Sequence, residues 1–569
     1  MTANSVMEAT MMLRDPAMVM NPHRLGAMHQ TRISFVRSLL RKMANEGWRL
    51  SLQRWDLQDE GFGTVIYELA TPQHIYQMVV FSDAIADDER IDRVIAEKWD
   101  VTFALIKGRV SQEGLEQLRQ NVPLQEAGRN SPKVLVLSRA NKSVRVFEHI
   151  VDTLANGEQP DSSVIASVGY ILRTTAVYGN GKFGIADFET LQDNADFHLS
   201  FSAQMCAVYL LRQFSLDWIH FIAEKRGGQR AVTLSSGLQR YIGIGNATGL
   251  GMAPYLIMHP RVVDKWLTQR ELALATVLAL PVDEMRVADV CRLLEKACKH
   301  LCQVETIDNN QRALNAQSVI ELVDIIATIN AKTNPKMQWE SIYALAKSLS
   351  LETQEILLTC LLEVHPEQVN VFAEDMNCDQ TLSLTPGVQI GAMMSLIETR
   401  YQWVMDIDFS QPDSQYWFWY RSVDKEEPRM AVRGEEPGED NELNLDVARQ
   451  VHRLYLALKE SDQQASLARF LLNYPSLRTI ARRVWTMGNL PMGDIQINVL
   501  SREVRPMHLL RCKLSMFGAT KFDPRSDRWV RVTLFQGAPL FAELSTEDIE
   551  QSWLFPLLPE ADTKRENQP

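Results

Sequence analysis

Three consecutive stretches near the N-terminus, each rich in β-forming residues and separated by short turns, constrain the fold of this chain most. They are WRLSLQRWDL (48–57), GTVIYELA (63–70) and HIYQMVVFS (74–82). Because the connections are so short, consecutive antiparallel pairing is the simplest topology. WDVTFALIKG (99–108) and KVLVLS (133–138) are a fourth and a fifth candidate strand. We therefore predict an N-terminal antiparallel α+β domain over residues 25–158.

The remaining sequence changes character twice. Residues 159–378 carry apolar positions at three- and four-residue spacing and predict a central, mainly helical domain that contains two glycine-rich turns. Residues 379–560 predict a C-terminal mixed domain with strands at 400–409, 415–422, 494–500 and 529–535 and helices at 444–459 and 463–486. Residues 561–569 form a tail. A multidomain α+β protein agrees with a length of 569 residues, which exceeds what one core usually holds.

Composition narrows the classes of partner. The chain is 46% hydrophobic and 23% charged, which is ordinary globular composition. A formal charge of −12 opposes general attraction to nucleic acid or to anionic membranes, so we expect neither partner. Seven cysteines in so long a chain do not form a disulfide scaffold, and no secretion signal is recognisable. A soluble, cytoplasmic protein is the prediction, with a homo-oligomer as an open option.

The first glycine cluster lies in RTTAVYGNGKFG (173–184) and imitates a nucleotide-binding loop. Gly179, Gly181 and Gly184 satisfy the dinucleotide pattern G-x-G-x-x-G. Lys182 and Phe183 crowd that loop, however, and no second parallel strand is expected at the usual distance. A kinase reading lacks its lysine strand, catalytic loop and metal-binding motif. A glycine-rich corner with cationic and small polar side chains is what remains.

The second cluster, RYIGIGNATGLGMAPYL (240–256), contains four glycines around Asn246 and Thr248. Taken alone, it predicts a connection between two helices that needs positive φ angles. Bare backbone amides together with arginine or lysine are also what a carboxylate or phosphate requires. We therefore hypothesise that both clusters converge on one pocket for a small anion. Two independent structural turns are the alternative.

These observations favour an enzyme that acts on a small anionic metabolite, with a metal-free lyase or transferase as the preferred class. No cofactor can be named. The expected substrate-binding residues are Arg173, Thr174, Asn180, Lys182, Asn246 and Thr248, and the expected catalytic residues are Tyr178, Lys182 and His198. Arg173 and Lys182 would hold the anion, and Tyr178 or His198 would move a proton. A non-catalytic binding or assembly protein is the first alternative, and a nucleotide-dependent enzyme is the second.

Overall fold

The structure is a computed structural model and forms two compact units, each assembled from separate stretches of sequence. Unit 1 comprises Met1–His29, Leu250–Arg286 and Thr333–Ser515, and unit 2 comprises Gln30–Gly249, Val287–Lys332 and Met516–Pro569. The domains expected from the sequence were consecutive stretches of chain, whereas each of these units combines separate stretches. The residues described are 13–86, 98–121, 131–174, 194–197, 202–249, 256, 259–332, 337–374, 385–411, 417–421, 428–432, 447–488, 490–494, 506–526, 529–544 and 553–559.

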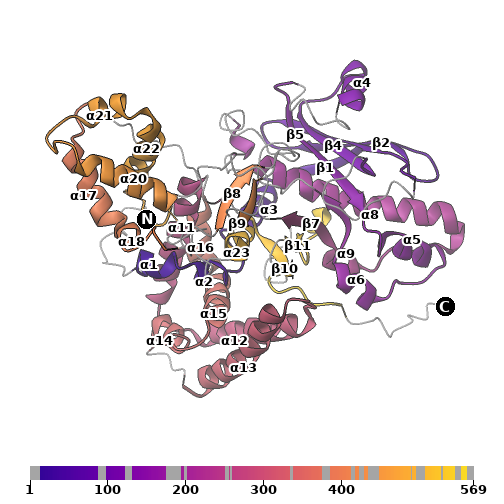
Figure 1. Ribbon diagram of the computed structural model, residues 1–569. Helices are drawn as coiled ribbons and strands as arrows, with labels where there is room; N and C mark the ends of the chain where they lie inside the picture. The colour runs from indigo at the N-terminus through magenta and orange to yellow at the C-terminus, as the bar shows by residue number, and fades with distance from the viewer. Residues whose placement is uncertain are drawn as a thin grey trace. The chain divides into compact units, whose positions relative to one another are not determined.

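A nine-stranded sheet organises unit 2 (Figure 1). Its order is β1 (Arg49–Leu57), β2 (Gly63–Ala70), β3 (Ile75–Ser82), β4 (Val101–Lys107), β5 (Val134–Lys142), β6 (Tyr170–Thr174), β7 (Gly243–Gly249), β11 (Trp529–Leu534) and β10 (Ala519–Ser526). All neighbours pair antiparallel except β6 and β7, which are parallel. The α+β class and the antiparallel run at the N-terminus are therefore confirmed.

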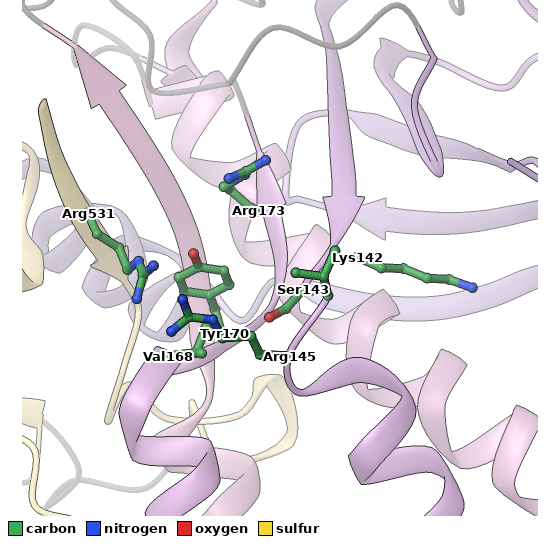
Figure 2. A pocket seen from close by; sticks show the side chains of 8 residues that line it. Lys142, Ser143, Arg145, Val168, Tyr170, Arg173 and Arg531 are labelled. Atoms are coloured by element: carbon green, nitrogen blue, oxygen red, sulfur yellow. The ribbon is translucent and has the colours of Figure 1, made fainter. Parts of the chain in front are cut away.

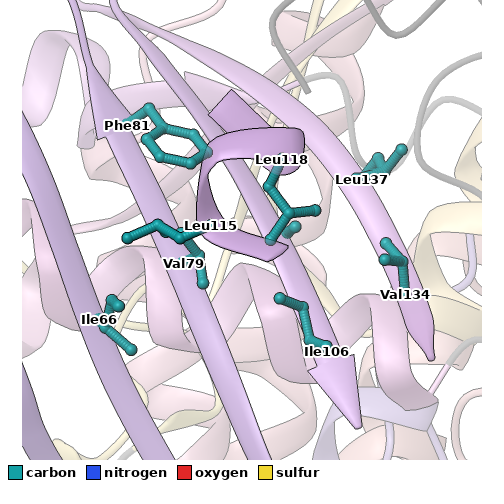
Figure 3. Close-up of a cluster of buried hydrophobic side chains, with 9 residues drawn as sticks. Ile66, Val79, Phe81, Ile106, Leu115, Leu118, Val134 and Leu137 are labelled. Atoms are coloured by element: carbon teal, nitrogen blue, oxygen red, sulfur yellow. The ribbon is translucent and has the colours of Figure 1, made fainter. Parts of the chain in front are cut away.

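Helices cover the two faces of this sheet. The long α8 (Ser202–Gly227) is buried along most of its length and packs against α5 (Phe147–Ala155) and α3 (Phe35–Asn45). Tyr67 of β2 donates a hydrogen bond to Asp217 of α8, which identifies the α8 face of the sheet. Since strand side chains alternate, the neighbouring Ile66 points to the opposite face. There it joins a hydrophobic cluster with Leu115 and Leu118 of α4 (Gln112–Asn121), shown in Figure 3.

Unit 2 also contains shorter helices and a helical hairpin. The short helices are α6 (Ser162–Val168) and α9 (Ser236–Tyr241). The hairpin consists of α13 (Asn309–Lys332) and most of α12 (Glu284–Gln303). These helices agree with the apolar spacing of the sequence.

The described part of the second glycine cluster, Gly243–Gly249, is a strand and not the expected helix-to-helix connection. Gly243 and Gly245 lie in β7 without a positive φ. A Cβ on Gly245 would lie 2.4 Å from atoms of the Tyr170 ring, and a Cβ on Gly243 would lie 2.3 Å from the carbonyl oxygen of Leu534. Glycine is therefore required here because neighbouring strands approach closely and a tyrosine ring lies flat on β7.

Unit 1 is mainly helical. Its helices are α1 (Pro16–Val19), α2 (Pro22–Leu25), α11 (Pro260–Leu278), α14 (Trp339–Ala344), α15 (Leu351–Glu363), α16 (Pro366–Glu374), α17 (Ile390–Arg400), α18 (Gln402–Met405), α20 (Val447–Lys459), α21 (Leu467–Asn473), α22 (Arg478–Met487) and most of α23 (Pro506–Phe517). Strands β8 (Trp417–Arg421) and β9 (Pro428–Val432) form an antiparallel pair, and β8 lies within the strand expected at 415–422. None of the helices within the described ranges is long and apolar enough to cross a membrane.

The strand expected at 400–409 was wrong, because this segment continues a helical stripe. Tyr401 and Val404 are buried, and with Ile397 of α17 they repeat at four and three residues. That spacing places all three on one helical face. Strand-forming composition was overridden by packing against neighbouring helices. Of the strand expected at 494–500, only residue 494 is described.

Candidate functional site: a basic cavity on the sheet of unit 2

A concave space that is open to solvent lies at the junction of β6, β11 and the segment that follows β5. Its lining includes three arginines, Arg145, Arg173 and Arg531, together with Tyr170 and Ser143. Figure 2 shows the guanidinium groups of Arg145 and Arg531 close to the Tyr170 ring, with Arg173 further along β6. Arg145 is exposed, Arg173 is half-buried, and only 9% of Arg531 is exposed. Cations from three parts of the sequence therefore surround one concave space.

Strand register explains why these side chains meet. Arg173 of β6 lies opposite Gly245 of β7, and Arg531 of β11 lies opposite Ala247. Residues 245 and 247 point to the same face of β7, because side chains alternate along a strand. The two arginines therefore share a face with β7 between them. Because Gly245 has no side chain, the Tyr170 ring lies directly against β7 at this position.

The neighbouring strand β10 adds two more cations and one carboxylate. Asp523 lies opposite Arg531, and its carboxylate lies 2.6 Å from Nη2 of Arg525. Lys521 is buried and donates a hydrogen bond of 3.0 Å to the carbonyl oxygen of Ala166 in α6. Arg531 Nη1 is buried and has no hydrogen-bond partner among the residues that the structure describes. Asp523 is thus a single carboxylate among several cations.

Burial and charge act together on this group. Burial lowers the pKa of Lys521; Asp523 opposes that change, and Arg531 and Arg525 lower the pKa further. Burial likewise lowers the pKa of Arg525, and the positive charges of Arg531 and Arg145 add to that effect. Burial raises the pKa of Asp523 although three cations oppose it. Among these described groups the cations outnumber the carboxylate, which favours an anion.

Lys142 lines the cavity with its stem, but its charge lies elsewhere. The ammonium Nζ is 4.4 Å from the ring centroid of Phe147 and 4.7 Å from that of Trp218, as expected for cation–π contacts. Figure 2 shows the side chain extending away from the arginines. We therefore do not count Lys142 among the cations of the cavity.

The structure describes only some of the residues predicted from the glycine clusters. Arg173 lines the cavity, as an anion-binding residue would. Tyr178, Asn180, Lys182 and His198 lie outside the described residues. Of Thr248 only the backbone is described, in register with Val530.

Thr174 and Asn246 are buried on the other face of the sheet. Thr174 follows Arg173 and Asn246 follows Gly245, so alternation turns both toward the α8 face. The hydroxyl of Thr174 donates to the carbonyl oxygen of Arg139. The amide of Asn246 is fully buried and has no hydrogen-bond partner within the described part of the chain. The structure thus places Arg173 and Asn246 on adjacent strands, but their side chains lie on opposite faces of the sheet.

Sequence reasoning missed Arg145 and Arg531. Arg531 carries a usable signal, because it interrupts the apolar strand WVRVTLF at an inward position. A mostly buried arginine in such a strand needs a negative partner. Arg145 carries no comparable signal, since it is an exposed residue in a connection.

A second charged cluster lies within unit 1 and is closed. Glu355 of α15 is fully buried and contacts Arg24 at 2.7 Å, Arg14 at 3.2 Å and Arg270. Arg14 also pairs with the buried Glu271 at 2.6 Å. These arginines hold the pKa of Glu355 well below its usual range, although burial alone would raise it. Each of these three guanidinium groups therefore meets a carboxylate of the protein itself.

A hydrogen-bonded group at the start of β3 was also missed by the sequence analysis. The buried Asp196 accepts hydrogen bonds from Tyr76 at 2.6 Å and from Thr71 at 3.1 Å, and it lies 2.7 Å from Nδ1 of His74. The His74 side chain is 32% exposed. Asp196 thus ties β3 to the short helix η3 (Ala195–Phe197).

The comparisons with known proteins do not assign a function. No family model, no curated protein and no solved structure matches the chain. Within the described ranges, no group of three or more histidine, cysteine, aspartate or glutamate side chains is arranged to hold a metal ion.

Proposed function

We propose that unit 2 binds a small anionic metabolite, a carboxylate or a phosphate, in the cavity formed by Arg145, Arg173, Arg531 and Tyr170. The observation that carries the proposal is the set of arginines that line one concave space, of which Arg531 is mostly buried. Burying a guanidinium is costly unless an anion pairs with it. A bound anion supplies that partner through charge-assisted hydrogen bonds.

The reaction proposed for this site is that of a lyase or a transferase. Tyr178, Asn180 and Lys182 belong to the segment that follows β6 directly in the sequence, next to Arg173. In this proposal Lys182 contacts the anion, Asn180 orients it, and Tyr178 or His198 transfers a proton. A protein that binds the anion without converting it is the alternative.

The experiment is a thermal-shift series on the full chain with inorganic phosphate, acetate and citrate at millimolar concentration. A ligand that binds only the folded state raises the unfolding midpoint by mass action. We expect a shift in the wild type that is lost in Arg173→Ala. Arg49→Ala is the matched control, because Arg49 is exposed on β1, at the far edge of the sheet. Equal shifts in Arg173→Ala and the wild type contradict the proposed site.

Lys182→Ala tests the extension to the glycine loop in the same series. Loss of the ligand-induced shift in a folded variant supports a direct role for Lys182. An unchanged shift argues that Lys182 is structural and leaves the arginine site as the whole of the binding proposal.

A further inference from the structure

The number and type of the cations around the cavity indicate more than the sign of the ligand's charge. Three arginine side chains line it, and Lys521 and Arg525 lie on the adjacent strand β10. Among the described residues, the carboxylate of Asp523 on β10 lies near these cations. Glu305 also acts on Lys521, as the weakest of its electrostatic neighbours. A ligand with two negative charges interacts more strongly with such a set of cations than a ligand with one.

The type of cation is also informative. A guanidinium is planar and presents N–H donors in a fixed fork, which matches the oxygens of a phosphate or a carboxylate in a bidentate manner. Arg145, Arg173 and Arg531 come from different elements and line one space, with Arg145 and Arg531 beside the Tyr170 ring and Arg173 further along β6 (Figure 2). A flat carboxylate offers two oxygens in one plane. A terminal phosphate group offers three oxygens in a tetrahedral arrangement and can face all three arginines.

We infer that the ligand carries a terminal phosphate group, bound as the dianion by Arg145, Arg173 and Arg531, so that its substrate class is a phosphate monoester. This inference rests on the proposed function, which left carboxylate and phosphate open. It predicts discrimination against phosphodiesters, which include nucleic acid and most phospholipids, because a diester carries one negative charge and one fewer free oxygen.

The Tyr170 ring limits the space beside the phosphate. It lies against Gly245, where even a Cβ would collide with it, and it lines the same cavity. The ring position is thus set by β7. The ligand's remaining atoms must extend toward the solvent side, where Arg145 is exposed.

The test is calorimetric titration of the full chain with methyl phosphate, dimethyl phosphate and acetate at pH 7.5 and pH 5.0. The second pKa of a phosphate monoester is about 6, so the dianion falls from nearly all of the ligand to about a tenth between these pH values. We expect methyl phosphate to bind at least tenfold more tightly than dimethyl phosphate or acetate at pH 7.5. We expect its affinity to fall about tenfold at pH 5.0.

Titration of protein side chains does not produce the same fall in methyl phosphate affinity on acidification. Among the described residues lining the cavity or facing it from β10, the titratable and charged side chains are Lys142, Arg145, Tyr170, Arg173, Lys521, Asp523, Arg525 and Arg531. Asp523 is the acid among them, and its pKa is raised by burial. Its protonation on acidification makes the cavity more positive and would strengthen anion binding, which is opposite to the expected change. Dimethyl phosphate, which stays a monoanion, measures any such contribution.

Two variants test whether methyl phosphate binds in the cavity. Arg531→Gln and Arg145→Gln should each weaken methyl phosphate at least tenfold at pH 7.5, and the exposed Arg145 keeps the test valid if Arg531→Gln misfolds. Arg49→Gln is the control and should bind as the wild type does. Equal binding of methyl phosphate and dimethyl phosphate, or a pH-independent affinity, overturns the phosphate inference but leaves the anion site. No binding of any anion overturns the proposed function as well.

Discussion

Arginines have different surroundings in two regions of the molecule: the network around Glu355 in unit 1 and the cavity around Arg531 in unit 2. In unit 1 the guanidinium groups of Arg14, Arg24 and Arg270 each contact a buried carboxylate. In unit 2 the arginines surround an open space, and their strand neighbour Asp523 already pairs with Arg525. The first arrangement is internally paired and therefore structural. In the function proposed above, the second accepts an anion from solution, and this difference separates a structural cluster from a candidate site.

The largest expected effect comes from breaking the closed network. Glu355→Gln leaves three arginines around an uncharged side chain, and removal of one partner from a buried ion pair typically costs about 3–5 kcal/mol. We expect amide hydrogen exchange in α15 and α11 to accelerate correspondingly, whereas β2 to β4 keep their protection. Glu367→Gln is the matched control, because its ion pair with Arg286 is half-exposed and should contribute less than about 1 kcal/mol. Unchanged protection of α15 in Glu355→Gln would contradict a structural role.

The next effect is on binding rather than on stability. Arg531→Gln removes a mostly buried guanidinium from the cavity, and a hydrogen bond to a charged group contributes about 1.5–3 kcal/mol. We expect the dissociation constant for methyl phosphate to rise by roughly tenfold to a hundredfold. Calorimetry measures it directly, with Glu355→Gln as a control that should keep wild-type affinity if it folds. Wild-type affinity in Arg531→Gln would remove this arginine from the site.

A smaller effect is expected at the contact between β6 and β7. Gly245→Ala places a methyl group 2.4 Å from Tyr170 ring atoms, so the ring or the strand must shift, at a cost of about 1–3 kcal/mol. Gly387→Ala is the control, because a Cβ there meets no atom within 4 Å. Urea unfolding monitored by fluorescence compares the two variants. Equal stability would mean that Tyr170 moves freely and does not define the cavity wall.

The smallest effect concerns Asp264, a buried carboxylate in α11 that lacks the arginines of Glu355. Burial raises its pKa to about 6, against which it accepts one hydrogen bond from the backbone N–H of Met492. The folded state therefore binds the proton more tightly than the unfolded state, and stability falls as pH rises from about 4 to 6. Asp264→Asn should remove this dependence and gain on the order of 1 kcal/mol at pH 8. Thermal unfolding from pH 4 to pH 8 tests it; a parallel pH profile in the variant would contradict the assignment.

Glu355 should show the opposite pH dependence. Its pKa is lowered in the folded state, so its contribution is complete above the ordinary carboxylate range and is lost only on strong acidification. Glu355 and Asp264 thus differ in pH dependence because their partners differ. Arginines stabilise the ionised form of Glu355, whereas ionised Asp264 destabilises the folded state above about pH 6.

Local patterns predicted much of the secondary structure because they report local preferences. The run from β1 to β5 followed from β-rich segments and short turns, and α8, α11 and α12 followed from apolar spacing. The strand β7 could not be found in this way. Its glycines disfavour a strand locally, and the strand exists because β6 and β11 pair with it from 70 residues before and almost 300 residues after.

The candidate site was predictable to the same limited extent. Arg173 was found because it lies at the start of the first glycine-rich stretch, whereas Arg531 depends on a pairing with Ala247, almost 300 residues earlier. Asn246 was assigned to the anion site from its place between glycines. Its orientation toward α8 follows from strand alternation, which is defined only once the segment is known to be a strand.

The central claim, that the cavity holds its positive charge for a ligand, is tested most directly by the ligand-free stability of Arg531→Gln. Thermal unfolding of the variant and the wild type is compared without added anion and with saturating methyl phosphate. The account predicts that the variant is at least as stable as the wild type without ligand, because a buried guanidinium is costly until an anion pairs with it, and that methyl phosphate raises the midpoint of the wild type more than that of the variant. A variant that is strongly destabilised without ligand, and then shifted by methyl phosphate as much as the wild type, would show that Arg531 is structural.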